Sequence, residues 1–212
     1  YKNLEIIVIS KGSGEYLLEI AEDLGAEIIL SQPSGLSPAA IKNEGLRKST
    51  GELIAFFESY DINGKMRFEM SVKRFEDNPR SGMVFCGTTF INEDGEFLSG
   101  VGKFPKFKGR QFLGHMYERN WISTISSTVF RSEAIQKAGG FDESFKSGEN
   151  YDLFLRIADL TRVEYIDLPL VRFRIMNNNG FDPVARRELE IKALKKHDPS
   201  AIAASISSIY DD

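Results

Sequence analysis

The chain has little cysteine, histidine and tryptophan: one cysteine, two histidines and one tryptophan in 212 residues. A single cysteine excludes a disulfide within the chain and a zinc site built on several thiolates. Cys86 lies in the apolar stretch 83–86, where a buried and unreactive thiol is expected. The sequence shows neither a signal peptide nor an apolar run long enough to span a membrane. We therefore expect a cytoplasmic protein. Any association with a membrane is expected to go through a partner.

An excess of charge of one sign is also missing. Lys and Arg number 27 and Asp and Glu 31, which gives a net charge of -4. This balance offers no overall basic surface for DNA or RNA, so nucleic acid is not an expected partner. With 42% apolar and 27% charged residues, a chain of this length is expected to be soluble, with a substantial core, as one large domain or as a domain with a small appendage.

The first half alternates between short apolar runs and amphipathic stretches. Residues 4–9 and 27–30 are expected strands, and the stretches 16–24 and 39–48 have helical spacing. Residues 53–57 form another apolar run, typical of a strand buried on both faces of a parallel sheet. This order predicts an α/β fold with a mostly parallel, Rossmann-like sheet flanked by helices.

The apolar run 53–57 ends abruptly at two acids, Glu58 and Asp61. Carboxylates at the carboxyl end of such a strand lie where open α/β sheets bind their ligands. The same acids are equally expected if they only begin a loop and cap the helix that follows. The spacing alone leaves both interpretations open.

The second half is expected to be smaller, with mixed or antiparallel strands. Its turn 92–95 (NEDG) predicts a hairpin. The helical stretch 148–158 opens with Glu149, Asn150 and Asp152, and acids in a first turn are also explained by the helix dipole alone. The other predicted elements are strands 83–91, 96–98, 125–130, 163–168 and 170–175, and helices 64–77, 132–138 and 186–196.

Several motifs follow one another in a specific order. Between residues 1 and 175 the chain reads YKNLEIIVI, SPAAIKNEGLRKSTGELIAFFESYD, INEDGEFL, KAGGFDESFKSGENYDLFLRIA and LPLVRFRI. This set resembles the family 2 glycosyltransferases, nucleotide-sugar-dependent enzymes with the GT-A fold. The resemblance implies a nucleotide-sugar-binding half at 1–98, an acceptor-side half at 99–180 and a helical appendage at 181–212. The family's first strand–helix unit, about 30 to 40 residues, has no counterpart here, so we expect a truncation or a partner that supplies it.

The resemblance implies one displacement at an anomeric carbon. A divalent metal neutralises the diphosphate leaving group, and a carboxylate acts as base on the acceptor hydroxyl. The metal, Mn²⁺ or Mg²⁺, is expected at Glu58 and Asp61. The family's usual Asp-x-Asp-Asp reads Glu58-Ser59-Tyr60-Asp61 here, and the neutral phenol of Tyr60 is a poor ligand for a hard cation. We therefore expect only weak metal binding at this degenerate motif.

The expected base position also departs from the family pattern. Asn150 stands where the family has its aspartate, and an amide cannot accept a proton at neutral pH. Glu149 or Asp152 is then the expected base. The family's late Arg-x-His reads Arg174-Ile175-Met176, without the histidine that can reach a metal.

The expected nucleotide site combines Ser10, Lys11, Lys42 and Glu58. Ser10 and Lys11 replace the acids that the family usually carries after this strand. Lys42 retains the positive charge of the arginine that the family usually carries before the asparagine, here Asn43. On the acceptor side, Trp121 is either a sugar platform or a packed core ring.

The resemblance implies one function, and the departures from the family pattern suggest another. The first is an inverting glycosyltransferase that uses a UDP- or GDP-type nucleotide-sugar and a glycan or other hydroxyl acceptor, as in polysaccharide or glycoconjugate synthesis. The second is a catalytically degenerate domain that binds a glycan or nucleotide, or that holds a partner chain or a second copy. The motifs predict the fold more strongly than the activity. A third alternative is an unrelated nucleotide-binding α/β domain, since a fold does not fix a function.

Overall fold

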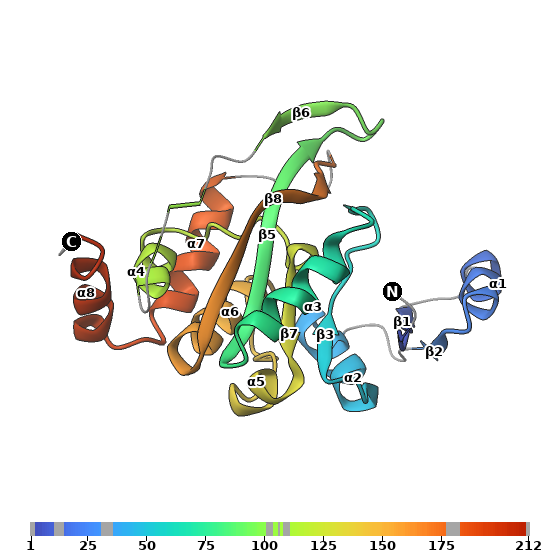
Figure 1. Ribbon diagram of the computed structural model, residues 1–212, viewed down its shortest axis with the longest axis horizontal. Coiled ribbons are helices and arrows are strands. Elements are labelled where there is room, and N and C mark those ends of the chain that lie inside the picture. The colour runs from blue at the N-terminus through green and yellow to red at the C-terminus, as the bar shows by residue number, and fades with distance from the viewer. Residues whose placement is uncertain are drawn as a thin grey trace.

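The fold is built around one long, curved strand, β5 (Ser81–Ile91), which runs through the larger sheet (Figure 1). The computed structural model describes residues 3–10, 15–30, 36–100, 104–105, 107, 111–176 and 183–210. The other strands are β1 (Ile7–Ser10), β2 (Glu27–Leu30), β3 (Leu53–Ala55), β4 (Ile62–Asn63), β6 (Phe97–Gly100), β7 (Thr128–Arg131) and β8 (Arg162–Arg174). The helices are α1 (Glu15–Asp23), α2 (Pro38–Lys48), α3 (Arg67–Asp77), α4 (Gln111–Glu118), the 3-10 turn η1 (Ile125–Ser127), α5 (Ser132–Lys137), α6 (Glu149–Leu160), α7 (Pro183–Leu194) and α8 (Pro199–Ser207).

The larger sheet is mixed. Its strand order is β3-β7-β5-β8-β4, with β6 paired to β5. The β5–β8 pair is parallel, and the β3–β7, β5–β7, β5–β6 and β4–β8 pairs are antiparallel. The predicted α/β class is confirmed, but the expectation that 53–57 forms a parallel strand is wrong. An apolar run does not encode strand direction, and the partner of β3 lies some 75 residues further along the chain.

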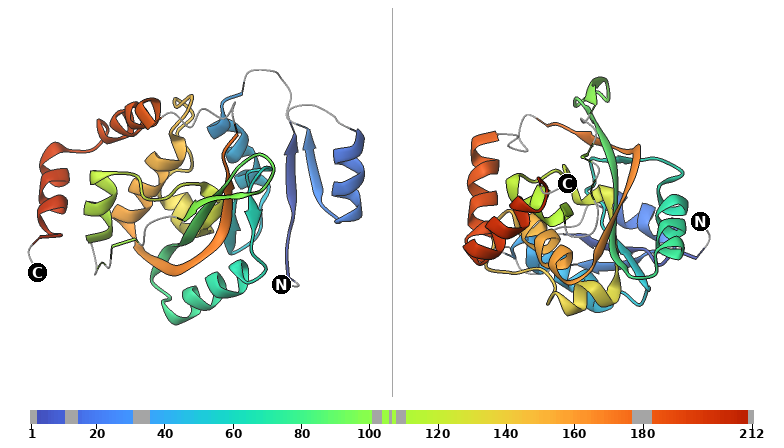
Figure 2. Two further views of the ribbon diagram at one scale, coloured as in Figure 1. Left: turned by 90° about the horizontal axis from the view of Figure 1, so that it is seen from above. Right: turned by 60° about the vertical axis from the view of Figure 1, so that its left-hand side comes forward.

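The alternation of side chains along β5 divides the core into two layers. Met83 and Phe85 face the larger hydrophobic cluster, which also contains buried residues of α4, α5 and α6. Val84 and Cys86 face the smaller cluster, together with Phe75 of α3. Successive side chains of a strand point to opposite faces, so helices cover both faces of this sheet. Figure 2 shows α3 on one side of the sheet and α6 on the other.

Strand β8 continues through Pro169, which was predicted to separate two strands. Residues 163–168 and 170–175 were expected as separate strands, whereas β8 runs from Arg162 to Arg174 and includes Pro169. The pairing with β5 is irregular at this point, where Gly87 is opposite Pro169. A Cβ atom on Gly87 would lie 3.0 Å from the Leu168 carbonyl oxygen, so glycine permits this close approach.

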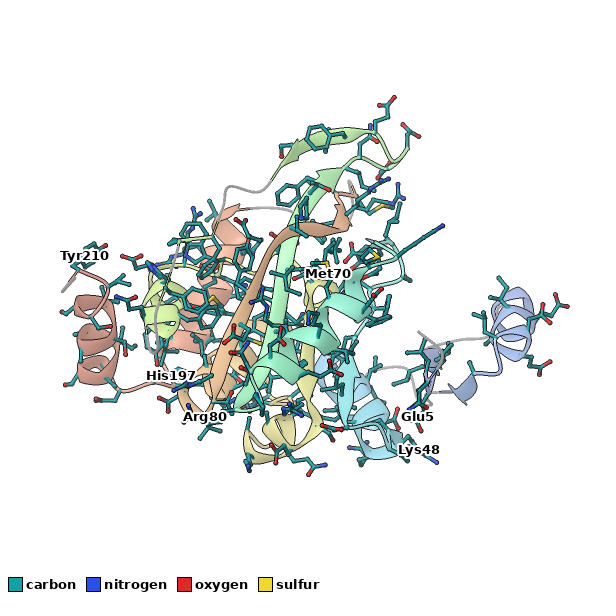
Figure 3. The ribbon with its side chains drawn as sticks, in the orientation of Figure 1. Glu5, Lys48, Met70, Arg80, His197 and Tyr210 are labelled. Carbon is teal, nitrogen blue, oxygen red and sulfur yellow. The ribbon has the colours of Figure 1, made fainter. Side chains whose placement is uncertain are left out.

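The strands β1 and β2 form a small parallel sheet of their own, packed with α1 at one end of the molecule (Figures 1 and 2). Glu5 connects this unit to the end of α2: its carboxylate accepts hydrogen bonds from the Thr50 backbone N–H at 2.8 Å and the Thr50 hydroxyl at 3.1 Å. Figure 3 shows Glu5 beside this end of α2, near Lys48. Strands and helices alternate in the first half as expected, in the order β1, α1, β2, α2, β3.

Two features differ from the pattern-based prediction of the second half. Residues 125–130 are a 3-10 turn followed by the short strand β7, because Thr124 caps the turn by accepting a hydrogen bond from the Ser126 backbone N–H. Helix α4 was not predicted: its buried residues Phe112, Leu113, Met116 and Tyr117 recur at helical spacing, but the helix is only eight residues long and gives a short pattern. No helix among the described residues is long and apolar enough to cross a membrane. The proposed boundaries 1–98, 99–180 and 181–212 stay predictions.

Candidate active site

Lys42 of α2 draws three of the expected site residues to one point. Its ammonium nitrogen lies 2.6 Å from Oε1 of Glu149, 3.1 Å from Oδ1 of Asn150 and 3.6 Å from Oε1 of Glu58. Glu149 is 107 residues from Lys42 in sequence, so only the fold joins them. The Lys42 side chain is 14% exposed and that of Glu149 6%, against 31% for Glu58. The cluster therefore opens to solvent on the Glu58 side.

Local sequence signals fix where the two helices that carry Lys42 and Glu149 begin. Helix α2 begins after Ser37, whose hydroxyl accepts a hydrogen bond from the Ala40 backbone N–H at 3.2 Å, and Pro38 fits the first helical turn. Glu149 is the first residue of α6, where the helix dipole favours a negative charge. Gly148 precedes it with φ 87°, a conformation that glycine adopts without strain.

The loop after β3 is fixed by the segment that leads into β7. The Glu58 backbone N–H donates to the Ser126 hydroxyl at 3.0 Å. The Thr124 hydroxyl donates to Oδ2 of Asp61 at 2.7 Å, and the Arg174 backbone N–H donates to its Oδ1 at 3.3 Å. Both oxygens of Asp61 are thus hydrogen-bonded within the protein. Burial, with the neighbouring carboxylates of Glu58 and Asp61, raises the pKa of Tyr60, so its phenol stays neutral.

Asp152 lies in a different set of ion pairs. Its side chain is fully buried, with Oδ2 2.6 Å from Nη2 of Arg156 and Oδ1 3.0 Å from Nζ of Lys196. Arg156 also donates to the Gly140 carbonyl at 2.8 Å and to the Ala138 carbonyl. The carboxylate of Asp152 therefore holds the 138–140 turn and the end of α7 against α6. Of the two acids expected as base, Glu149 is the one that contacts Lys42.

The remaining expected site residues lie apart from Lys42 or outside the described part of the chain. Ser10 ends β1, where it is paired with Leu30, and Lys11 lies outside the described residues. Trp121 packs edge-on against Phe104, with ring centroids 5.4 Å apart. The Arg119 guanidinium covers one face of the indole, 3.5 Å from the ring centroid. That face is closed to a stacked sugar.

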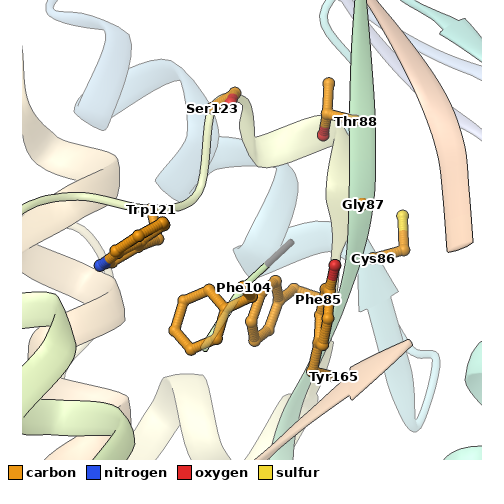
Figure 4. Close-up of a pocket in the computed structure, with 8 residues that line it drawn as sticks. All are labelled: Phe85, Cys86, Gly87, Thr88, Phe104, Trp121, Ser123 and Tyr165. Carbon is orange, nitrogen blue, oxygen red and sulfur yellow. The ribbon is translucent and has the colours of Figure 1, made fainter. Parts of the chain in front are cut away.

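The cavity beside Trp121 is small. It measures about 10 Å³, enough for one water molecule. Figure 4 shows its lining: Phe85, Cys86, Gly87, Thr88, Phe104, Trp121, Ser123 and Tyr165. A larger and more open hollow of about 360 Å³ lies between β4, the start of α3 and β8, and none of the expected site residues lines it. Neither hollow is lined by Lys42, Glu58, Glu149 or Asn150. The candidate site is assigned to these four residues because of their contacts, not because of a hollow.

The side chains around Lys42 fit a divalent metal poorly as they are placed. Carboxylate and amide oxygens are suitable ligands for Mg²⁺ or Mn²⁺, but an ammonium group already lies among those of Glu58, Glu149 and Asn150. Asp61 uses both oxygens in protein hydrogen bonds. Within the described ranges, no three His, Cys, Asp or Glu side chains group closely enough to hold a metal ion. A metal at Glu58 and Asp61 stays a prediction that this geometry does not favour.

Sequence reasoning missed the residues that hold the site acids in place. Thr124 and Ser126 fix Asp61 and Glu58, and the polar run TISST before β7 was the only available signal. Lys196, near the end of α7, forms an ion pair with Asp152 at 3.0 Å. No local pattern marks Lys196, because its partner is 44 residues away.

Comparisons with known proteins identify relatives over about four fifths of the chain. An uncharacterized glycosyltransferase of Rickettsia bellii is 27% identical over 187 residues, which are 84% of this chain and 26% of the relative. The pre-mycofactocin glycosyltransferase of Mycobacterium tuberculosis is 29% identical over 180 residues, 80% of this chain and 37% of that protein. The chain thus spans well under two thirds of these relatives.

Solved structures give the same fold. Staphylococcus aureus TarS 1-349 in complex with UDP-GlcNAc matches with a TM-score of 0.69 at 12% identity, over 98% of this chain and 62% of that one. The complex of the same TarS fragment with UDP matches with a TM-score of 0.63 at 15% identity, over 91% of this chain and 62% of that one. The family profile described as glycosyltransferase like family 2 matches residues 1–183. The chain therefore belongs to the glycosyltransferase-like family 2.

Proposed function

We propose that this domain transfers a sugar from a UDP- or GDP-type nucleotide-sugar to a hydroxyl group of a glycan or another acceptor. The observation that carries the proposal is the convergence of Glu58, Asn150 and Glu149 on Lys42. These residues come from the loop after β3, the start of α6 and the middle of α2, and the sequence motifs had marked each of them. The UDP-GlcNAc and UDP complexes of TarS support the donor class.

The reaction is a single displacement. The acceptor oxygen attacks the anomeric carbon, the bond from that carbon to the phosphate oxygen breaks, and the nucleoside diphosphate leaves with the bonding electrons. Attack opposite the leaving group inverts the anomeric configuration. The hydroxyl proton passes to a carboxylate, for which Glu149 is the proposed base because Asp152 is held by Arg156 and Lys196.

Lys42 has two proposed tasks in this reaction. Its charge offsets the negative charge of the leaving diphosphate, which the bond cleavage increases. It also holds the Glu149 carboxylate at 2.6 Å in one orientation. The partly exposed Glu58, 3.6 Å from the ammonium, is the member of the cluster that an incoming phosphate group would displace.

The test combines calorimetry with a turnover assay. UDP and GDP are titrated into the chain, and hydrolysis of the matching nucleotide-sugars is then followed with and without glycan acceptors. Binding of one nucleotide in the micromolar range and turnover that falls at least 100-fold in Glu149→Gln are expected. Glu133→Gln, an exposed acid on α5, is the matched control and should leave turnover unchanged. Full turnover in Glu149→Gln would contradict the assigned base.

A second candidate function is a binding or scaffolding domain without turnover. The burial of Asp152 in ion pairs and the amide of Asn150 at the family's base position favour it. This alternative predicts nucleotide or glycan binding with no sugar transfer under any condition. It also predicts that Glu149→Gln leaves that binding intact.

A further inference from the structure

We propose that Lys42 is the resident cation of the candidate site and takes the place that a divalent metal ion would hold. Three oxygens surround its ammonium nitrogen: Glu149 Oε1 at 2.6 Å, Asn150 Oδ1 at 3.1 Å and Glu58 Oε1 at 3.6 Å. Two carboxylates and one amide oxygen converging on one point are the donor types that hold Mg²⁺ or Mn²⁺. Here they surround an ammonium, which donates hydrogen bonds to Glu149 and Asn150 and forms a longer ion pair with Glu58.

The arrangement is built into the fold. Lys42 comes from the middle of an 11-residue helix, and its side chain is only 14% exposed. The next residue, Asn43, clamps α2 against the turn before α6 through two hydrogen bonds of 2.9 Å with the Phe141 backbone. This clamp sets where α2 lies relative to Glu149. The ammonium is therefore held among the oxygens by the packing of two helices.

Outside the cage, which is formed by the side-chain oxygens of Glu58, Glu149 and Asn150, the remaining residues of the motif do not make a second cation site. Both oxygens of Asp61 accept hydrogen bonds, from the Thr124 hydroxyl and the Arg174 backbone N–H. Tyr60, between Glu58 and Asp61 in sequence, offers a phenol, which is a poor ligand for a hard cation. A metal ion entering the site would have to displace Lys42 from Glu149. The charge of Lys42 opposes that entry.

The inference deepens the proposed function, and only its consequence for donor binding rests on that function. If Lys42 is the cation, a nucleoside diphosphate meets a positive charge that is always present. Its affinity then does not depend on added metal. Glu58 is more exposed than Glu149 and farther from the ammonium, so phosphate oxygens would replace Glu58 while Glu149 remains in place.

The first experiment measures metal binding without any nucleotide. Mn²⁺ is titrated into the wild-type chain, and free Mn²⁺ is followed by electron paramagnetic resonance. The wild type should leave Mn²⁺ free up to the millimolar range. Lys42→Met removes the charge, keeps most of the volume and leaves the three oxygens, so it should bind one Mn²⁺ at least tenfold more tightly. Lys137→Met, an exposed lysine on α5, is the control and should behave like the wild type.

A second variant identifies the cage. Lys42→Met combined with Glu149→Gln should lose the Mn²⁺ site again, because one of the two carboxylates has become an amide. Lys42→Met leaves Glu149 buried without its cation, so circular dichroism melts with and without Mn²⁺ check its folding. If the variant is destabilised, Mn²⁺ should raise its melting temperature and leave that of the wild type unchanged. Wild-type binding of one Mn²⁺ that Glu149→Gln abolishes would overturn the inference.

The last experiment separates this inference from the proposed function. UDP and GDP are each titrated into the wild-type chain in EDTA and in Mn²⁺, and for the nucleotide that binds, the two dissociation constants should agree within threefold. An affinity at least tenfold higher in Mn²⁺ would overturn the role of Lys42. Absence of UDP and GDP binding in both buffers would instead contradict the proposed function, while the Mn²⁺ titrations still decide what occupies the cage.

Discussion

Asn43 and Phe141 exchange two hydrogen bonds across 98 residues of sequence. The Asn43 carboxamide accepts from the Phe141 backbone N–H and donates to the Phe141 carbonyl, both at 2.9 Å. The same amide nitrogen donates to Glu143 Oε1 at 2.9 Å. A side chain that pairs with a backbone in this way acts like a neighbouring strand residue. It joins α2, which carries Lys42, to the turn that leads into α6.

Replacement of Asn43 by alanine should destabilise the domain by about 2 to 3 kcal/mol, since two hydrogen bonds to a buried backbone segment are lost. Urea unfolding followed by fluorescence measures the change. Gln136→Ala is the matched control, because its amide makes one long bond of 3.3 Å to Ser132 on an exposed helix face. It should change stability by less than about 0.5 kcal/mol. Equal losses in both variants would contradict the clamp.

Adjacent glycines in the 138–140 turn allow a stricter test of the same contact. Gly139 and Gly140 have φ of 84° and 73°, so alanine is strained at both. A Cβ on Gly140 would lie 3.0 Å from Asn43 Oδ1, whereas a Cβ on Gly139 meets nothing within 4 Å. Gly139→Ala should cost about 1 to 2 kcal/mol, and Gly140→Ala at least about 1 kcal/mol more.

A double-mutant cycle assigns this difference to Asn43. In the Asn43→Ala background the obstructing oxygen is gone, so Gly140→Ala should cost no more than Gly139→Ala. An undiminished cost of Gly140→Ala in that background would show that the obstruction lies elsewhere in the turn.

Asp142 should link stability to pH. Hydrogen bonds from the Lys196 ammonium at 2.5 Å and the Ser144 backbone N–H at 2.8 Å lower the pKa of this carboxyl well below its ordinary value. A lowered folded-state pKa contributes stability above the unfolded-state pKa of about 3.9, and that contribution is lost as pH falls toward the folded-state pKa. The gap in unfolding free energy between wild type and Asp142→Asn should therefore be largest near neutral pH and shrink below about pH 4.

The measurement is urea unfolding at a series of pH values. Asp94→Asn, an exposed acid in the β5–β6 turn, is the control and should run parallel to the wild type. A gap for Asp142→Asn that stays constant down to about pH 2 would contradict the linkage to Lys196.

Motif positions marked four residues that the fold brings together, whereas an apolar run did not reveal the direction of β3. Lys42, Glu58, Glu149 and Asn150 were each marked by motif position, and the fold brings them within 3.6 Å of one ammonium nitrogen. The direction of β3 was missed because strand pairing depends on a distant partner, and an apolar run looks the same in parallel and antiparallel sheets.

The two acids of α6 show a second limit of sequence reasoning. Glu149 and Asp152 both lie in the first turn and both are buried. The spacing could not separate them, because their difference lies in their partners. Glu149 meets Lys42, and Asp152 meets Arg156 and Lys196. Lys42 lies on α2, Arg156 on α6 itself and Lys196 in the turn after α7, so tertiary packing decides which acid faces the site.

Cys86 was expected to be a buried and inert thiol, and the structure gives the physical reason. It is 4% exposed on the side of β5 that faces α3, and burial raises the pKa of its thiol to about 11. At pH 8 only about one thiol in a thousand is then ionised, and the thiolate is the reactive form. An aromatic disulfide reagent should therefore label Cys86 only after urea unfolds the chain. Ser200→Cys adds an exposed thiol on α8 as a control that should react at once. Rapid labelling of the native wild-type chain would show that β5 or α3 opens far more often than this packing implies.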